Sequence, residues 1–152
     1  MKINNTEEKI ISNHSEQQWR RREKELTAWL QRSKQKQRPK QTAYVDNIEI
    51  DIELLGTLTL LRRMNIQTEF SCAGVSILDE PQDHSLYGYL TLIASSEADQ
   101  FVKIAMQYMR HRLLVTYEPS RNRYDLSSFY IGHNRSFCLL LEKSAQLFQL
   151  GR

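Results

Sequence analysis

The stretch Leu86-Tyr87-Gly88-Tyr89-Leu90-Thr91-Leu92-Ile93 decides the fold, because it is apolar over nearly its whole length. Such a run is typical of a strand that is covered on both faces, so we expect it in the interior of a sheet. Ser95 or Ser96 then caps a helix, and Glu97 and Asp99 favour its positive end. The apolar residues of this helix recur at helical spacing, as Phe101, Ile104, Ala105, Tyr108 and Met109. The sequence therefore predicts a central strand followed by a helix.

Three further strands are predicted from apolar and β-branched runs bounded by turn residues. Ile66 to Cys72 precedes the central strand, whereas Leu113 to Tyr117 and Leu126 to Ile131 follow it. The segment Glu118 to Asp125 contains proline and asparagine, so we expect a turn there and a hairpin around it.

Three more helices are predicted around these strands. The first begins at Ser15, where a capping box is present, and ends near Lys34. The second spans Ile52 to Met64. The last begins with Asn134 as its cap, although Phe137 to Leu141 also fits a fifth strand. This mixed order predicts an α+β two-layer sandwich, with a sheet of about four strands, helices on one face and an amphipathic basic helix at the N-terminus.

Charge is divided unevenly along the chain, whose formal net charge is +3. Residues 1–40 hold 11 Lys and Arg against 5 Asp and Glu, whereas the other residues hold 10 against 13. We therefore predict a basic helical arm and linker over 1–41 and an α+β domain over 42–152. A basic arm is typical of proteins that meet polyanions or acidic partners, and a solvated helix face explains the same composition.

Composition predicts a cytoplasmic protein without a membrane segment. No apolar run approaches the ~20 residues that cross a bilayer, and the N-terminus lacks the apolar core of a secretory signal. Cys72 and Cys138 are too few for a disulfide framework. We expect no metal site, because the spacing of the cysteines and of the acidic loop before His84 matches no calcium or zinc motif.

Two segments are predicted to bind an anionic ligand. In the first, small residues follow a strand, so that free N–H groups of the backbone can meet an anion; its candidates are Ser71, Cys72 and Gly74. A tight turn that needs small side chains explains this segment equally well. The second lies at a predicted helix N-terminus, with Asn134, Arg135 and Ser136 as candidates and Arg135 as an anion clamp. A solvated arginine beside an ordinary helix cap is the alternative.

Thiol catalysis is a competing hypothesis. A cysteine thiolate needs a nearby imidazole or positive charge, so the candidate catalytic residues are Cys72, His84 and His133. The sequence does not identify a cofactor.

The N-terminal helix supplies a third candidate surface. Its cations neutralise phosphates and its indoles stack on bases, or its apolar stripe pairs with a second copy of the chain or another protein. The residues concerned are Trp19, Arg20, Arg21, Arg22, Lys24 and Trp29.

The segment 44–74 carries a resemblance. It has an aspartate at Asp46, then a helix, then a strand that ends in Thr68-Glu69-Phe70-Ser71-Cys72-Ala73-Gly74. This pattern resembles small uncharacterised proteins of Bacillus-type bacteria and phages, with the motif Thr-x-x-Ser-Cys-x-Gly. It is more distantly similar to the tRNA wybutosine-synthesis methyltransferases of the Trp-Tyr-Trp-three family. Ala73 and Val75 stand where those enzymes have serine and arginine. The resemblance adds Asp46 to the candidate ligand residues.

These observations favour a non-catalytic module that binds a small anionic ligand or a nucleic-acid segment and forms a homodimer through its N-terminal helix. The alternatives are an RNA-modifying or thiol-dependent enzyme centred on Cys72, and a regulatory or mobile-element protein that binds a partner through the same helix.

Overall fold

The computed structural model describes residues 8–32, 41–76 and 85–151. Short 3-10 turns precede α2 and α4 and follow α3. The elements in chain order are β1 (Lys9–Ile10), α1 (Glu16–Gln31), β2 (Thr42–Val45), β3 (Ile48–Asp51), α2 (Leu55–Arg63), β4 (Thr68–Cys72), β5 (Tyr89–Ile93), α3 (Ser96–Met109), β6 (Leu113–Glu118), β7 (Arg123–Ser128) and α4 (Asn134–Leu150).

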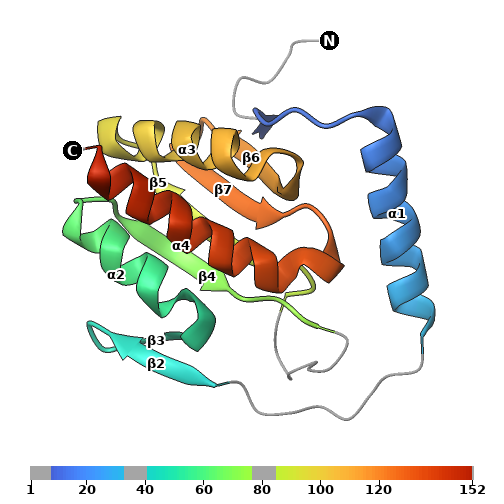
Figure 1. Ribbon diagram of the computed structural model, residues 1–152, viewed down its shortest axis with the longest axis horizontal. Helices are drawn as coiled ribbons and strands as arrows, with labels where there is room; N and C mark the ends of the chain where they lie inside the picture. Colours follow the sequence, from blue (N-terminus) through green and yellow to red (C-terminus); the bar gives the residue numbers. More distant parts are fainter. Residues whose placement is uncertain (1–7, 33–40, 77–84, 152) are drawn as a thin grey trace.

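The main sheet has five strands in the order β1-β6-β7-β5-β4, and every neighbouring pair is antiparallel. The helices α2, α3 and α4 lie together on one face of this sheet, with α4 between the other two (Figure 1). The α+β prediction is confirmed. The prediction of about four strands is wrong, because β1 adds a fifth strand at the edge and β2 and β3 form a separate hairpin.

The core lies between the helices and one face of the sheet. Leu90 and Leu92 of β5 point into it, and Leu126 of β7 is the neighbour of Leu90. All three side chains are fully buried, and they pack in one cluster with apolar residues of α2, α3 and α4. On the other face of the sheet, the Thr91 hydroxyl donates to the Asp125 carboxylate at 2.6 Å. The prediction that β5 is an inner strand is confirmed, because it pairs with both β7 and β4.

Several predicted element boundaries are corrected by the structure. β7 begins at Arg123 rather than Leu126, because Asn122 adopts a φ of 54° and closes a turn much shorter than predicted. Residues 129–131 leave the sheet, and Phe129 and Tyr130 are buried in a second cluster. Phe137 to Leu141 lie within α4, so the helical interpretation is confirmed and the fifth-strand alternative is wrong for this segment.

The helix α1 begins with the predicted capping box, in which Ser15 and Gln18 each bind the backbone N–H of the other. It ends at Gln31, earlier than predicted. Among the described residues, no helix is both long and apolar enough to cross a membrane. The division of the chain near residue 41 into an arm and a domain stays a prediction.

Candidate functional site

The small-residue turn after β4 already holds a carboxylate of the protein itself. The Ala73 N–H donates to Oδ2 of Asp51 at 2.7 Å, and the Gly74 N–H points to Sγ of Cys72 at 3.5 Å. The Asp51 side chain comes from the end of β3, and only 8% of this residue is exposed. An external anion at this turn therefore has to compete with Asp51.

Gly74 is needed for a close approach between this turn and α4. Its φ is +80°, a left-handed conformation that side-chain-bearing residues rarely adopt. A Cβ at this position overlaps the amide group of Asn134 and the backbone nitrogen of Gly88. The structure thus explains Gly74 by backbone conformation and packing.

The Asn134 side chain joins α4 to two backbone segments, one at Val75 and one at residues 86–88, rather than capping its helix. Its Oδ1 accepts the Gly88 N–H at 2.9 Å, and its Nδ2 donates to the carbonyl oxygens of Val75 and Leu86 at 2.7 and 2.8 Å. Only 2% of the residue is exposed. The predicted capping role is wrong, because Asn134 is the first residue of α4 and these three groups occupy its side chain.

The N-terminal end of α4 also has an internal carboxylate. Glu25 of α1 accepts the N–H groups of Ile131 and Gly132 at 2.6 and 3.0 Å. Anions favour such a position because the backbone N–H groups there are unpaired within the helix. The remaining two candidates lie nearer the surface: Arg135 is exposed, and the Ser136 hydroxyl donates to the His133 carbonyl at 3.0 Å.

The two thiols are buried. Only 4% of Cys72 and 4% of Cys138 is exposed. Burial, followed by the nearby carboxylates of Glu53 and Asp51, raises the pKa of Cys138 to about 12. His133 packs edge-on against the ring of Tyr130 at a centroid distance of 5.2 Å.

Burial lowers the pKa of His133, and the positive charge of Arg112 lowers it further. The third catalytic candidate, His84, lies outside the described residues. Within the part of the chain that the structure describes, no group of three or more His, Cys, Asp or Glu side chains is arranged to hold a metal ion.

The helix α1 finds its packing surface on the domain itself. Trp19 lies against a buried cluster of Leu114, Phe129 and Tyr130, and its ring meets the Phe129 ring edge-on at 4.9 Å. Arg22 donates to the Phe129 carbonyl at 2.6 Å. The apolar stripe of this helix is therefore partly covered without a second copy of the chain.

The other arm candidates remain closer to solvent. Arg20 is exposed and pairs with Glu16 at 3.4 Å, and Lys24 is also exposed. Arg21 lies over the ring of Tyr130 at 4.5 Å. Trp29 is half-buried under Arg32, whose guanidinium lies 3.6 Å from the centre of the indole.

A basic concave surface lies between the end of α3 and the first turns of α4. It is an open groove of about 630 Å³, and none of its described lining residues is acidic. Its polar lining residues are Arg110, His111, Arg112, Ser136 and Lys143, and its apolar ones are Tyr108, Met109, Leu139 and Leu140. We call this surface the basic groove.

One contact ties the basic groove to a predicted residue. Arg112 donates to the Ser136 hydroxyl at 3.0 Å, and Ser136 directly follows Arg135 on α4. Arg110 has a φ of 53°, so α3 ends there in an uncommon backbone conformation. Sequence reasoning missed this groove, although the adjacent Arg110-His111-Arg112 was a visible signal.

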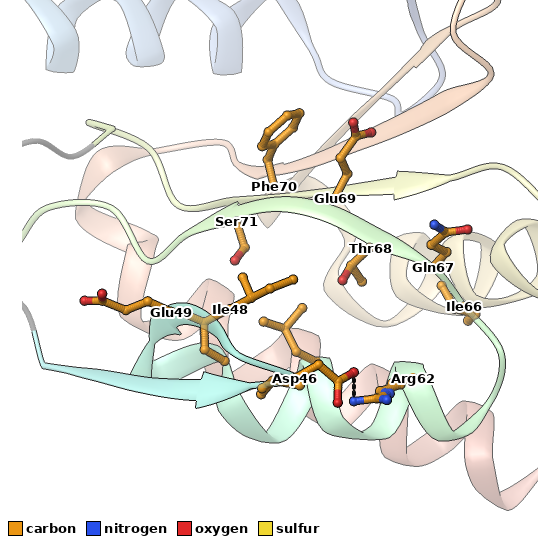
Figure 2. A pocket seen from close by; sticks show the side chains of 13 residues that line it. Asp46, Ile48, Glu49, Arg62, Ile66, Gln67, Thr68, Glu69, Phe70 and Ser71 are labelled. Carbon is orange, nitrogen blue, oxygen red and sulfur yellow. Dashed lines mark ion pairs between the residues drawn. The ribbon is translucent and has the colours of Figure 1, made fainter.

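A second groove lies between β4 and the β2–β3 hairpin (Figure 2). It has a volume of about 490 Å³, and both Asp46 and Ser71 line it. Asp46 forms an ion pair with Arg62 of α2. The structure thus brings together two of the residues that the resemblance selected, at a strand edge and beside acidic side chains.

Comparisons of the chain with protein-family models, with curated proteins and with solved structures found no match. The resemblance over residues 44–74 stays a prediction.

Proposed function

We propose that this protein is a non-catalytic module that binds a segment of single-stranded nucleic acid in the basic groove. The observation that carries the proposal is the lining of this groove, where Arg110, Arg112 and Lys143 gather with His111 and no described acidic residue. Arginine and lysine bind phosphates through charge-assisted hydrogen bonds, and a run of phosphates needs several such cations along one surface.

The apolar part of the groove favours single strands. Tyr108 is 42% exposed and Leu139 is 66% exposed, so both present large apolar surfaces beside the cations. Bases of a single strand stack on aromatic rings without sequence preference, whereas those of a duplex are already stacked on each other. An open groove that carries cations beside apolar side chains suits this mode of binding.

A further cation lies near the start of α4, where Arg21 of α1 covers the ring of Tyr130 at 4.5 Å. Besides burial, Arg112 and Arg21 lower the pKa of His133, whereas Glu25 raises it. Arg21 belongs to α1, and this helix is held to the start of α4 by the Glu25 carboxylate, which accepts the N–H groups of Ile131 and Gly132. Arg21 thus adds a cation near the start of α4, although no described residue of α1 lines the basic groove itself.

The test is the fluorescence anisotropy of a labelled twelve-nucleotide single strand, titrated with protein at several salt concentrations. We expect the double variant Arg110→Gln, Lys143→Gln to bind more weakly. The magnitude of its slope of log K against log salt concentration decreases by about 1.4, which is about 0.7 for each of the two lost phosphate contacts. Arg63→Gln, Arg121→Gln is the matched control, because it removes two exposed charges outside the groove.

Two results contradict the proposal. Equal weakening by the two double variants means that overall charge, not the groove, determines binding. Displacement of the strand by inorganic phosphate at the same concentration of phosphate groups means that the site takes a small anion rather than a strand.

A further inference from the structure

The groove between β4 and the β2–β3 hairpin points to a second binding site of opposite charge. Within the described part of the chain, β4 is the last strand of the sheet and pairs with β5 alone. Its other edge faces the hairpin across the groove of about 490 Å³ (Figure 2). We propose that an extended peptide segment with apolar and basic residues binds there as an additional strand beside β4.

The hairpin and β4 enclose the groove between them. The hairpin and β4 are joined at one end, where the Asp51 carboxylate accepts the Ala73 N–H at 2.7 Å. Away from this contact, side chains of β3 and β4 line opposite walls of the groove. An edge strand presents backbone N–H and C=O groups that pair with an incoming extended chain. The hairpin supplies the opposite wall.

The side chains of β4 point to two opposite sides of the strand. The register of β4 against β5 shifts between Thr68 and Ser71, which is a β-bulge. Figure 2 shows Thr68 and Ser71 pointing towards the hairpin, while Glu69 and Phe70 point the other way. Phe70 is 55% exposed, so it is available to a neighbouring side chain of an added strand.

The floor of the groove is apolar. It is lined by Leu58 and Ile66, which are buried, and by Ile48, which is 64% exposed. Ile48 is an apolar side chain in the middle of an open groove, and its contact with a peptide removes that surface from water. Every second residue of a bound strand points to this floor, so these residues are apolar.

The rim of the groove has a small excess of acidic side chains, which Glu49 carries. The ionisable residues that line it are Asp46, Glu49, Glu69 and Arg62, and Arg62 is already paired with Asp46. Glu69 accepts from Arg123 at 2.8 Å, whereas Glu49 is exposed on the hairpin. A peptide whose outward residues are lysine or arginine complements this rim. The site is distinct from the basic groove, because the two grooves share no described lining residue.

The experiment uses an acetylated nine-residue peptide of alternating valine and lysine as the probe. Binding is measured by calorimetry and by the amide resonances of β4. We expect Glu49→Lys to weaken binding about three- to tenfold, because it replaces an attraction by a repulsion. Glu23→Lys, an exposed change on α1, is the matched control and leaves the affinity unchanged. The combined variant Ile48→Ser, Glu49→Lys tests the apolar floor and weakens binding further.

Three outcomes overturn the proposal. The first is the absence of binding by the valine–lysine peptide, with the protein shown to be folded. The second is equal binding of a peptide in which prolines replace the valines, because proline cannot donate to the β4 edge. The third is self-association that Ile48→Ser abolishes, because the occupant is then a second copy of this chain. None of them affects binding of nucleic acid to the basic groove.

Discussion

Replacement of Asn134 by alanine tests how the end of α4 is joined to the sheet. The side chain makes three hydrogen bonds to backbone groups, at 2.7 to 2.9 Å. Each is worth about 0.5–1.5 kcal/mol, and the buried Gly88 N–H that loses its acceptor adds a desolvation cost of about 1–3 kcal/mol. We expect Asn134→Ala to lower the free energy of unfolding by at least about 2.5 kcal/mol, the lower end of the combined range. For a chain of this length a loss of that size lowers Tm by about 5–10 °C.

The assay is urea unfolding followed by circular dichroism. Gln146→Ala is the matched control, because it removes an amide of similar chemistry from an exposed position on the same helix. Asn134→Asp keeps an acceptor for the Gly88 N–H but sets a carboxylate against the carbonyl oxygens of Val75 and Leu86. It therefore destabilises at least as strongly as alanine at neutral pH. A loss below about 1 kcal/mol for Asn134→Ala, with an unchanged m-value, refutes the reasoning.

Three further predictions concern the turn, the helix and the pH dependence. Gly74 has a φ of +80°, so we expect Gly74→Ala to lower the free energy of unfolding by about 1–3 kcal/mol. Urea unfolding measures this change, and an unchanged free energy of unfolding means that the turn relaxes freely. Glu25→Ala removes both hydrogen bonds to the start of α4, so hydrogen exchange over 16–31 accelerates, and the exposed Glu23→Ala leaves it unchanged. Burial lowers the pKa of His14 from its usual 6.5, so folding favours the neutral ring and stability falls as the pH drops below 6.5 through the folded pKa. His14→Phe keeps an aromatic ring stacked on Phe129 but removes the titrating group, so the urea midpoint changes less between pH 5 and 8. An equal change of the midpoint with pH in the variant contradicts this role of His14.

Two carboxylates occupy the positions at which the sequence predicted an external anion. Asp51 binds the turn after β4, and Glu25 binds the start of α4. Both stabilise groups that otherwise lack a partner, so they act as fixed internal anions. We therefore propose the basic groove, whose described lining residues include Arg110, Arg112 and Lys143 and no acidic residue, as the place where an external anion binds.

The turn of the β2–β3 hairpin is visible in the sequence as Asp46-Asn47, but we interpreted Asp46 as a ligand residue. Asp46 and Asn47 have φ values of 51° and 65°, and Val45 pairs with Ile48 across this two-residue turn. Positive φ at both central positions is typical of the tightest hairpins, and aspartate and asparagine tolerate it best after glycine. Asp46 was predicted as a ligand residue from the resemblance, whereas its backbone explains its place in the turn.

The amino-acid sequence by itself determined the class of the fold and its long elements. Periodic apolar residues predicted α3 and α4, a capping box predicted the start of α1, and a continuous apolar run predicted β5. Each of these signals acts between residues that are close along the chain, so it is visible without a structure.

The tertiary structure alone decided which groups meet and which remain exposed. Glu25 and Ile131 are 106 residues apart, Ala73 and Asp51 are 22 apart, and Gly88 and Asn134 are 46 apart. The charges of the basic groove come from α4 and from the segment after α3, which touch only when the helices pack on the sheet. Local propensity carries no information on such pairs, because their energy depends on distance and burial in the folded chain.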